Sequence, residues 1–180
     1  MPGIRAQYNM ARSKVRLIKV QQLESRRVGR GVGDISVTIL EQAMSGELKI
    51  SDYMTKTPNS IEPHQTISEA RKRMKKLGCE HLPVLSGGQI VGIISDRDIL
   101  FVCGRQSEED SEIWVGDVMI TQVIKLDVST SLNEVVNTML ANKIGSVLLT
   151  KSGKLEGIFT ETDALGLLAE LTVGAKKLAA

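Results

Sequence analysis

The sequence has few of the residues that characterise several large classes of protein. Aromatic residues make up only 3% of the 180 residues, and the cysteines are Cys79 and Cys103 alone. Platforms that stack single-stranded bases depend on aromatic side chains, so such a platform is not expected. Two cysteines without a recognisable leader peptide do not support a secreted disulfide framework. We therefore expect both to be reduced thiols in the cytoplasm.

Long apolar runs are also missing. No window approaches the ~18 apolar residues that a membrane-spanning helix requires, because charged residues or glycines interrupt the longest candidates. Apolar residues nevertheless make up 42% of the chain. With so few aromatics, the interior must consist of Ile, Leu, Val and Met, which suits helices packed on strands. We expect a soluble protein with no membrane contact.

What the chain does contain is an internal repeat. Residues 52–100 align without gaps to residues 117–165, and nine positions are identical. About three identities would be expected by chance. Examples that fall at the same landmarks of each copy include Asp52/Asp117, Met54/Met119, Glu69/Glu134, Gly92/Gly157 and Asp98/Asp163. The duplication is the main organising feature of the chain.

Each copy carries the same series of local signals. Thr66 with Glu69, and Ser131 with Glu134, form the capping-box pattern that opens an amphipathic helix. Two short apolar runs separated by Ser and Gly follow in each copy and predict β-hairpins over 82–95 and 146–160. A second helix is predicted to begin at Ser95-Asp96-Arg97-Asp98 and at Thr160-Glu161-Thr162-Asp163.

These signals predict an α/β (α+β) fold of two tandem β-α-β-β-α units with an N-terminal basic arm. One unit has too little core to stand alone, so we expect the two to pack sheet to sheet. The predicted boundaries are an arm over residues 1–50, a first repeat over 51–110, and a second repeat with a C-terminal helix over 111–180.

The motifs together resemble the CBS-domain family, in the paired arrangement called a Bateman module, over about residues 50–172. In the first copy the resemblance lies in the segments 52–55, 78–84, 90–94 and 95–98, which have the order and spacing of the family. The second copy keeps Asp117, Met119, Gly157 and the segment 160–163. It has Ile120, Lys143 and Leu148 where the family usually has Thr, Gly and Pro.

The resemblance implies a regulatory module without catalysis that binds an adenosine derivative, namely AMP, ADP, ATP or S-adenosylmethionine, and commonly forms a disc-like homodimer. Adenine is expected beside the strand edges near 55–58 and 79–83, and the family uses the Asp of the second helix for ribose. The candidate ligand-binding residues are Thr55, Lys56, Pro58, Cys79, Glu80, His81, Leu82, Pro83, Ser95, Arg97, Asp98, Ile144, Gly145, Ser146, Thr160 and Asp163.

The second-helix starts also suit a nucleotide on chemical grounds. Helix N-termini offer unsatisfied N–H groups to phosphate, and a carboxylate can accept both hydrogens of a ribose diol. Arg97 could pair with a phosphate, whereas Thr162 at the matching position could not. The alternative is that Ser-x-x-Asp and Thr-x-x-Asp are ordinary helix caps without any ligand. Both interpretations remain open at this point.

Other chemistry has little support in the sequence. His64 and His81 lack neighbours with metal-ligand spacing, so no metal site is predicted. Cys79 lies close to His81, but nothing resembles an oxyanion hole, and we predict no catalytic residue and no catalytic cofactor. Met54, Met74, Met119 and Met139 are expected to fill the core.

The segment 1–30 holds eight Lys or Arg and one acidic residue, Glu24. This arm could contact the phosphates of nucleic acid, dock on an acidic protein partner or a neighbouring subunit, or be a solvated extension. Two functions follow from these observations. The leading hypothesis is a sensor in which ligand binding changes the dimer or a partner contact. The alternative is a dimerising adaptor whose basic arm makes the working contact.

Overall fold

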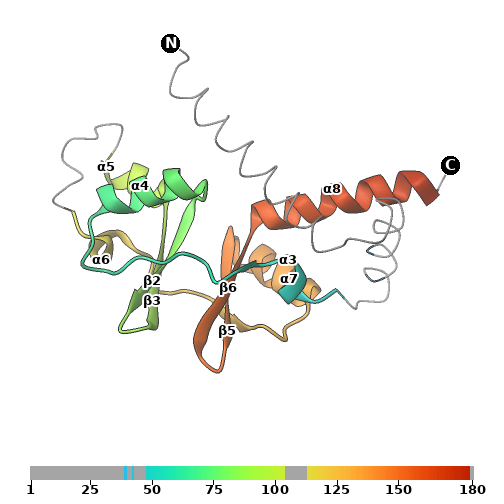
Figure 1. The fold of residues 1–180 in the computed structure, drawn as a ribbon, viewed down its shortest axis with the longest axis horizontal. Coiled ribbons are helices and arrows are strands. Elements are labelled where there is room, and N and C mark those ends of the chain that lie inside the picture. Colours follow the sequence, from blue (N-terminus) through green and yellow to red (C-terminus); the bar gives the residue numbers. More distant parts are fainter. Residues whose placement is uncertain (1–38, 40–41, 43–47, 104–112, 179–180) are drawn as a thin grey trace, which may run out of the picture. The chain divides into compact units, whose positions relative to one another are not determined.

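The computed structural model describes residues 39, 42, 48–103 and 113–178. Of the predicted arm over residues 1–50, residues 1–38, 40–41 and 43–47 lie outside this description. Helices and strands are interspersed along the described chain (Figure 1), which confirms the predicted mixed α and β fold. The first repeat contains α3 (Ile50–Tyr53), β1 (Thr55–Lys56), α4 (Ile67–Leu77), β2 (His81–Ser86), β3 (Gln89–Ser95) and α5 (Asp96–Cys103). The second repeat contains α6 (Val115–Val118), β4 (Lys125–Asp127), α7 (Leu132–Asn142), β5 (Ser146–Lys151), β6 (Lys154–Thr160) and α8 (Glu161–Leu178).

The two predicted capping boxes are present. The side-chain oxygens of Thr66 and Ser131 each accept a hydrogen bond from the backbone N–H three residues later, at 3.2 Å. The helices that follow, α4 and α7, each bury an apolar stripe against the core. The stripes recur at helical spacing, which is why the sequence pattern predicted both helices.

The chain folds into two compact units that cut across the repeats. The first unit contains Ser60–Val84 and Ile93–Ile120, and the second contains Leu85–Gly92, the chain from Thr121 onward and the segment that ends at Asn59. Each unit therefore combines the helices of one repeat with the short segment that opens the other repeat.

Hydrogen bonds at equivalent positions hold these exchanged segments. In the second unit, β1 pairs antiparallel with β6, with Thr55 opposite Ile158. In the first unit, Ile120 and Ile93 exchange two backbone hydrogen bonds, of 2.9 and 3.0 Å. In the alignment of the two repeats, Ile120 corresponds to Thr55 and Ile93 corresponds to Ile158. The exchange thus has the same register in both units.

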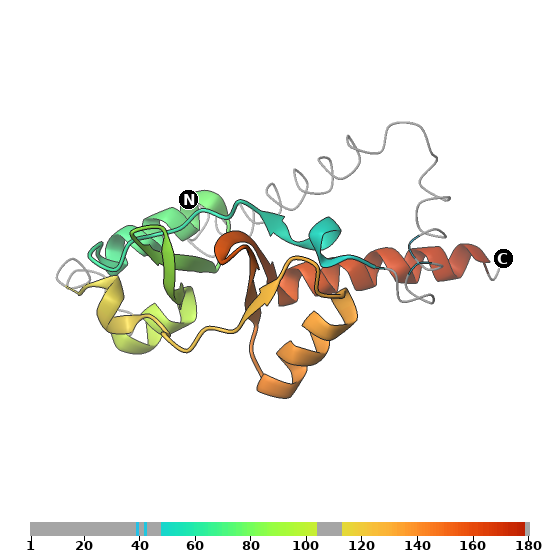
Figure 2. The ribbon, with the colours of Figure 1, turned by 90° about the horizontal axis from the view of Figure 1, so that it is seen from below.

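The second unit is built on a four-stranded sheet with the order β1-β6-β5-β4. Within it, β5 and β6 are antiparallel and β4 runs parallel to β5. In Figure 2 the β5–β6 hairpin adjoins α7 (orange) and the long α8 (red). Its buried core is the cluster Ile39, Leu48, Ile50, Met54, Leu132, Val135, Met139, Val147, Leu149, Phe159 and Leu167. Ile39 and Leu48 belong to this core although the predicted boundaries assigned them to the arm.

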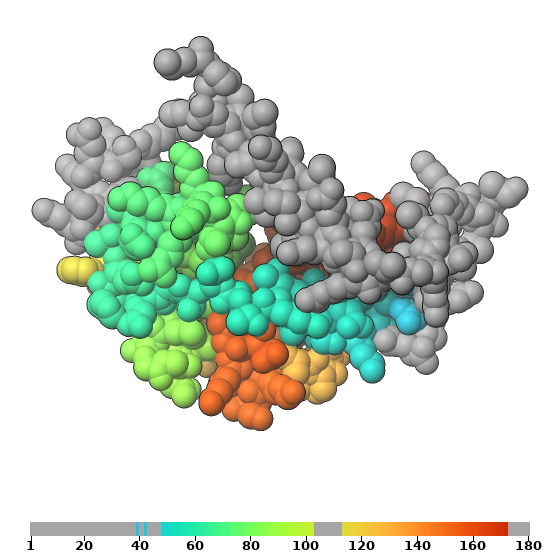
Figure 3. All heavy atoms as spheres, in the orientation of Figure 1, coloured from blue at the N-terminus to red at the C-terminus, as the bar shows by residue number. Residues whose placement is uncertain are grey.

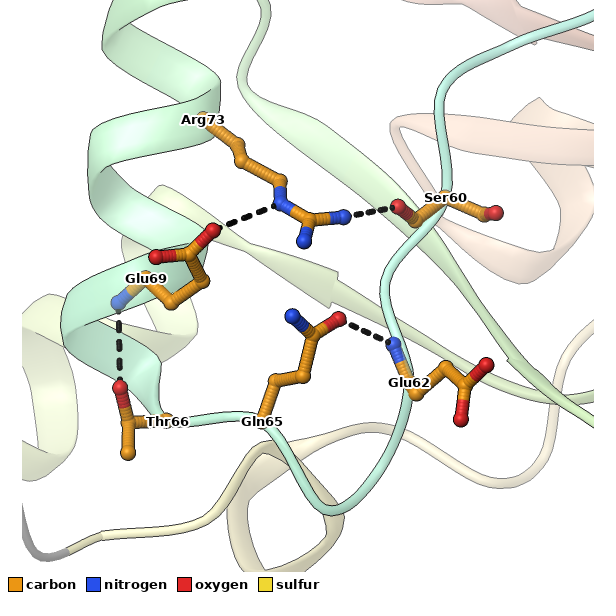
Figure 4. A network of polar contacts seen from close by, with 6 residues as sticks. All are labelled: Ser60, Glu62, Gln65, Thr66, Glu69 and Arg73. Atoms are coloured by element: carbon orange, nitrogen blue, oxygen red, sulfur yellow. Dashed lines mark hydrogen bonds and ion pairs between the residues drawn. The ribbon is translucent and has the colours of Figure 1, made fainter.

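The first unit contains α4, α5 and α6, which contact one another, and parts of the β2–β3 hairpin. A network of polar contacts fastens the segment before α4 to that helix (Figure 4). Arg73 donates to the carboxylate of Glu69 at 3.1 Å and to the backbone carbonyl of Ser60 at 2.9 Å. The backbone N–H of Glu62 donates to the side chain of Gln65 at 3.1 Å. None of the helices within the described ranges has the length and apolar composition needed to span a membrane.

Candidate functional site

The first candidate site is the junction between β3 and α5. The Asp98 carboxylate accepts hydrogen bonds through Oδ2 from the backbone N–H of Ser95, at 2.9 Å, and from its hydroxyl, at 2.5 Å. The N–H of Asp98 donates in return to the Ser95 hydroxyl at 3.1 Å. The two residues therefore form a reciprocal cap that satisfies donors at the start of α5.

The junction between β6 and α8 repeats this geometry. Asp163 Oδ2 accepts from the backbone N–H of Thr160 at 3.0 Å and from its hydroxyl at 2.8 Å. The N–H of Asp163 donates to the Thr160 hydroxyl at 3.4 Å. Both carboxylates are half-buried, and the motif acts as a helix cap in both units. The predicted capping role is confirmed, whereas the role in binding ribose stays a prediction.

The loops before the hairpins lie beside these helix starts. The backbone N–H of Asp96 donates to the Glu80 carbonyl at 2.9 Å, and that of Glu161 donates to the Gly145 carbonyl at 3.0 Å. In the second unit, Ser146 also lies opposite Thr160 across the β5–β6 ladder. The structure therefore places the candidate residues Cys79, Glu80, His81, Leu82 and Pro83 in the same unit as Ser95, Arg97 and Asp98. It places Ile144, Gly145 and Ser146 in the same unit as Thr160 and Asp163.

The candidate residues differ in exposure. Leu82 and Pro83 are buried, so their side chains serve the core and leave mainly the backbone for a ligand. Cys79, Glu80 and His81 are half-buried at the point where α4 turns into β2. Their partial exposure leaves these side chains accessible to a small molecule at the start of α5.

The exchange of opening segments changes the grouping expected from the sequence. Thr55 and Lys56 were counted with the first repeat, but they pair with β6, which ends at Thr160. The N–H of Thr57 extends this pairing by donating to the Glu156 carbonyl at 2.8 Å. Pro58 follows in the same unit and is half-buried. These residues therefore accompany Asp163 within one unit.

In the first unit the position equivalent to Thr55 belongs to Ile120, which the sequence interpretation did not select. Ile120 is 48% exposed and is hydrogen-bonded to Ile93, two residues before Ser95. The alignment of the two repeats would have found it, because Thr55 and Ile120 are equivalent positions. Ile120 was not predicted to bind ligand because it stands where the family usually has Thr.

The exchange also affects charge. Arg97 is exposed in the first turn of α5, while Thr162 occupies its place in α8. Lys56 is exposed on β1, the neighbour of β6. Arg97 in the first unit and Lys56 in the second thus lie on elements that contain or adjoin a Ser/Thr–Asp cap. In the part of the chain that the structure describes, no three His, Cys, Asp or Glu residues are grouped as metal ligands would be.

Comparisons with known proteins agree with the duplicated fold. The chain is 31% identical over 120 residues to the CBS domain-containing protein YhcV of Bacillus subtilis, covering 67% of this chain and 82% of that protein. It is 30% identical over 145 residues to inosine-5'-monophosphate dehydrogenase of Staphylococcus saprophyticus, covering 77% of this chain but only 28% of the enzyme. The chain spans only 28% of the length of this enzyme, and 52% and 28% of the length of two other curated relatives that it matches.

Two solved structures show the same architecture. A proposed acetoin utilization protein, AcuB, of Vibrio cholerae superposes with a TM-score of 0.62 and 27% identity, covering 72% of this chain and 96% of that one. CBSX2, solved in complex with AMP, superposes with a TM-score of 0.60 and 22% identity, covering 69% and 98%. The family profile of the CBS domain matches residues 50–104 and again residues 115–170. The chain belongs to the CBS-domain family, with two copies of the domain in tandem.

Proposed function

We propose that this chain is a non-catalytic regulatory protein that binds an adenosine-containing ligand at its Ser/Thr–Asp helix starts. AMP, ADP, ATP and S-adenosylmethionine are the candidates. The observation that carries the proposal is the duplicated arrangement of Ser95 with Asp98 and Thr160 with Asp163, each at the end of a hairpin. CBSX2, which shares the fold, was solved with AMP. A cytoplasmic location belongs to the same proposal.

The charges at these helix starts favour ribose at the carboxylate and phosphate elsewhere. The first turn of α5 contains Asp96 and Asp98, and that of α8 contains Glu161 and Asp163. Two carboxylates offset the attraction of a helix N-terminus for phosphate. A ribose diol, in contrast, donates hydrogen bonds to a carboxylate. A phosphate would then pair with Arg97 in the first unit and with Lys56 in the second.

A ligand at these positions would use the same carboxylates as the caps. A ribose that donates to Asp98 or Asp163 would share the carboxylate with Ser95 or Thr160, whose hydrogen bonds engage Oδ2. Carboxylate oxygens can accept more than one hydrogen bond, so cap and ligand are compatible. The cap then holds the carboxylate in place before the ligand arrives, which lowers the entropic cost of binding.

The catalytic activity of the dehydrogenase relatives is not part of the proposal. The match covers 28% of the Staphylococcus saprophyticus enzyme. The proposed role is instead that ligand binding changes how the chain contacts a second copy or a protein partner. We assign no catalytic cofactor, and the nucleotide acts only as a regulatory ligand.

The surfaces of α5 and α8 support a homodimer. Leu100, Phe101 and Val102 are exposed at the end of α5, with Phe101 91% exposed. Leu165 and Leu168 are exposed on α8. Leu100 and Leu165 are equivalent in the two repeats, so apolar side chains recur on the same face of the second helix. Exposed apolar groups of this kind mark association surfaces. We expect Phe101→Glu with Leu165→Glu to convert a dimer into a monomer in sedimentation equilibrium.

A thermal-shift panel of the four ligands tests the proposed binding. A ligand at about 100 times its Kd stabilises the native state by ~2.7 kcal/mol. We expect one ligand to raise the Tm of the wild type, and Asp98→Asn or Asp163→Asn to abolish the shift at its own site. Because these variants also weaken a cap, Thr66→Ala is the matched control, since it removes a cap in α4. The control should melt earlier but keep the full ligand shift.

The charged positions can be tested separately. Arg97→Gln and Lys56→Gln should reduce the affinity for ATP more than that for adenosine, because only ATP carries phosphates. Isothermal titration with both ligands measures the difference. If millimolar concentrations of all four ligands leave the wild-type Tm unchanged, the Ser/Thr–Asp motifs are caps only and the proposal is wrong.

A further inference from the structure

Helix α4 carries a concentration of positive charge that its counterpart in the second repeat lacks. Its 11 residues include one acidic residue, Glu69, and the basic residues Arg71, Lys72, Arg73, Lys75 and Lys76. Helix α7 also has 11 residues, with one acidic residue, Glu134, and no basic residue. Lys75 and Lys76 lie in the last turn of α4, where cations complement the helix dipole, but neither the capping of α4 nor its core packing requires a third lysine at position 72.

Part of this charge is used within the first unit. Arg73 is bound to the Glu69 carboxylate and to the Ser60 carbonyl (Figure 4), and it neutralises the one acidic side chain of the helix. The three lysines, in contrast, are all exposed. They are spaced by three and four residues, which places them on one face of the helix. This lysine face consists of Lys72, Lys75 and Lys76.

The lysine face lies opposite the buried stripe. Ile67, Ala70 and Met74 are the buried residues of α4, with 0%, 0% and 3% exposure. At 3.6 residues per turn, the lysines point away from this stripe. The α4 region (green) lies at the surface drawn in Figure 3. At the equivalent positions of α7 stand Asn137, Leu140 and Ala141, which are exposed but uncharged.

We propose that the lysine face of α4 is a docking surface for the phosphate backbone of nucleic acid, bound without sequence preference. Lys72 and Lys76 are separated by about 6 Å along the helix axis, at 1.5 Å per residue. Phosphates recur about every 3.4 Å along each strand of a duplex, so flexible lysine side chains at this spacing can reach separate phosphates. Lysine acts as a point charge and does not need a fixed geometry.

Other anionic partners fit this face less well. Interfaces with proteins rely on apolar and aromatic anchors at their centre. Helices that lie on membranes insert an apolar face. Among the exposed large apolar side chains of the described residues, none comes from α4. The apolar side of α4 is buried in the first unit and cannot enter a bilayer. A purely charged face without anchors matches phosphate contacts, which position a protein without reading bases.

The amino-acid sequence adds a second source of positive charge. Residues 1–30 contain eight Lys or Arg and one Glu. Together with the five basic residues of α4, they account for 13 of the 23 basic residues of the chain. Any polyanion that this N-terminal segment attracts would be held more tightly if α4 contributed further phosphate contacts. The test must therefore separate the lysine face from the general charge of the chain.

The experiment measures binding of the full chain to a fluorescently labelled duplex of mixed sequence by anisotropy, over a range of KCl concentrations. The test variant carries Lys72→Gln, Lys75→Gln and Lys76→Gln. The matched control carries Lys125→Gln, Lys151→Gln and Lys154→Gln, which removes the same charge from exposed positions of the second unit. Both variants keep the N-terminal residues, so the background they provide is equal.

We expect the test variant to bind at least ~10-fold more weakly than the wild type at about 50 mM KCl, and the slope of log affinity against log salt to fall by about 0.9 per lost phosphate contact, or about 2.7 for three. The control should remain within about twofold of the wild type. An equal loss in both variants would show general charge attraction, and no binding by the wild type would also overturn the proposal. So would α4-dependent binding to phosphatidylserine vesicles or polyglutamate but not to the duplex.

Discussion

Helices α4 and α7 have the same length and the same ends but different outer faces. Each begins with a hydroxyl that caps the N–H of a Glu three residues on, and each ends in a residue with left-handed backbone, Gly78 or Lys143. Their buried stripes also correspond. The positions outside these stripes diverge, most clearly the exposed ones, from three lysines in α4 to Asn137, Leu140 and Ala141 in α7.

This difference separates what the fold requires from what function could select. Caps and buried stripes satisfy backbone donors and remove apolar surface from water, so both repeats must keep them. Exposed positions cost little to change and can acquire a task in one repeat alone. The same logic applies to the second helices, where the caps are shared but Thr162 stands in the place of Arg97. A function that belongs to one repeat alone is therefore expected at the positions where the repeats differ.

The largest expected effect concerns the exchanged segment of the second unit. Gly157 lies against Met54, and a Cβ at Gly157 would overlap the Met54 sulfur. We expect Gly157→Val to destabilise the chain by roughly 2–3 kcal/mol, as overpacking of a buried site does. Urea unfolding measures the loss. Gly166→Ala is the control, because nothing lies within 4 Å of that position. Recovery of part of the loss in the Met54→Ala background would confirm the contact.

The helix C-termini offer the next comparison. Gly78 has a φ of 64° and Lys143 has a φ of 54°, where side chains with a Cβ are strained. Gly78→Ala should destabilise by roughly 1–2 kcal/mol, whereas Lys143→Gly should stabilise by roughly 0.5 kcal/mol after the entropy of glycine is counted. Thermal unfolding of both variants measures these two changes in stability. Changes of the same sign would contradict this comparison of the two ends.

The N-terminal caps should respond alike in the two repeats. Thr66→Ala and Ser131→Ala each remove a 3.2 Å hydrogen bond to the N–H of a Glu, Glu69 or Glu134. Each should cost about 1 kcal/mol in the free energy of unfolding. Thr66→Ser and Ser131→Thr keep the hydroxyl and should be nearly neutral. A cost in only one repeat would mean that the shared frame is not equally strong in both copies.

The smallest expected effect concerns the turn between β4 and α7. Hydrogen bonds from the Ser129 side chain and backbone lower the pKa of Asp127. A lowered folded pKa means that the stabilisation is present above the unfolded pKa and is lost as the pH falls through the folded pKa. Ser129→Ala should therefore lower stability slightly at pH 7 but not at pH 2. An NMR titration of Asp127 in this variant should show its pKa returning toward the ordinary value.

Local patterns predicted most of the framework. The capping pairs at Thr66 and Ser131 and the Gly-containing turns lie within a few residues of the elements they start or join, so the helices and hairpins could be predicted. The candidate residues at Ser95–Asp98 and Thr160–Asp163 were also found from their spacing, and the structure places them at equivalent helix starts. Their ligand could not be predicted, because a cap and a ribose site use the same carboxylate.

The grouping of residues across the repeats could not be predicted. Strand β1 is very short, and its pairing with β6 joins positions as distant in the chain as Thr55 and Ile158. Nothing in the sequence near Thr55 or Lys56 distinguishes pairing with its own repeat from pairing with the other. The assignment of both residues to the second unit therefore came only from the structure, as did the inclusion of Leu48 in its core.

The sequence by itself determined the duplication, the order of the longer helices and the hairpins, and the caps, because each depends on residue types at short, fixed spacings. Only the tertiary structure decided which opening segment pairs with which hairpin, and therefore that Lys56 lies on the strand beside β6. It also decided that Arg73 binds the Glu69 carboxylate and the Ser60 carbonyl. The physical reason is that long-range pairing and exposure depend on how the whole chain buries its apolar surface, which no short segment specifies.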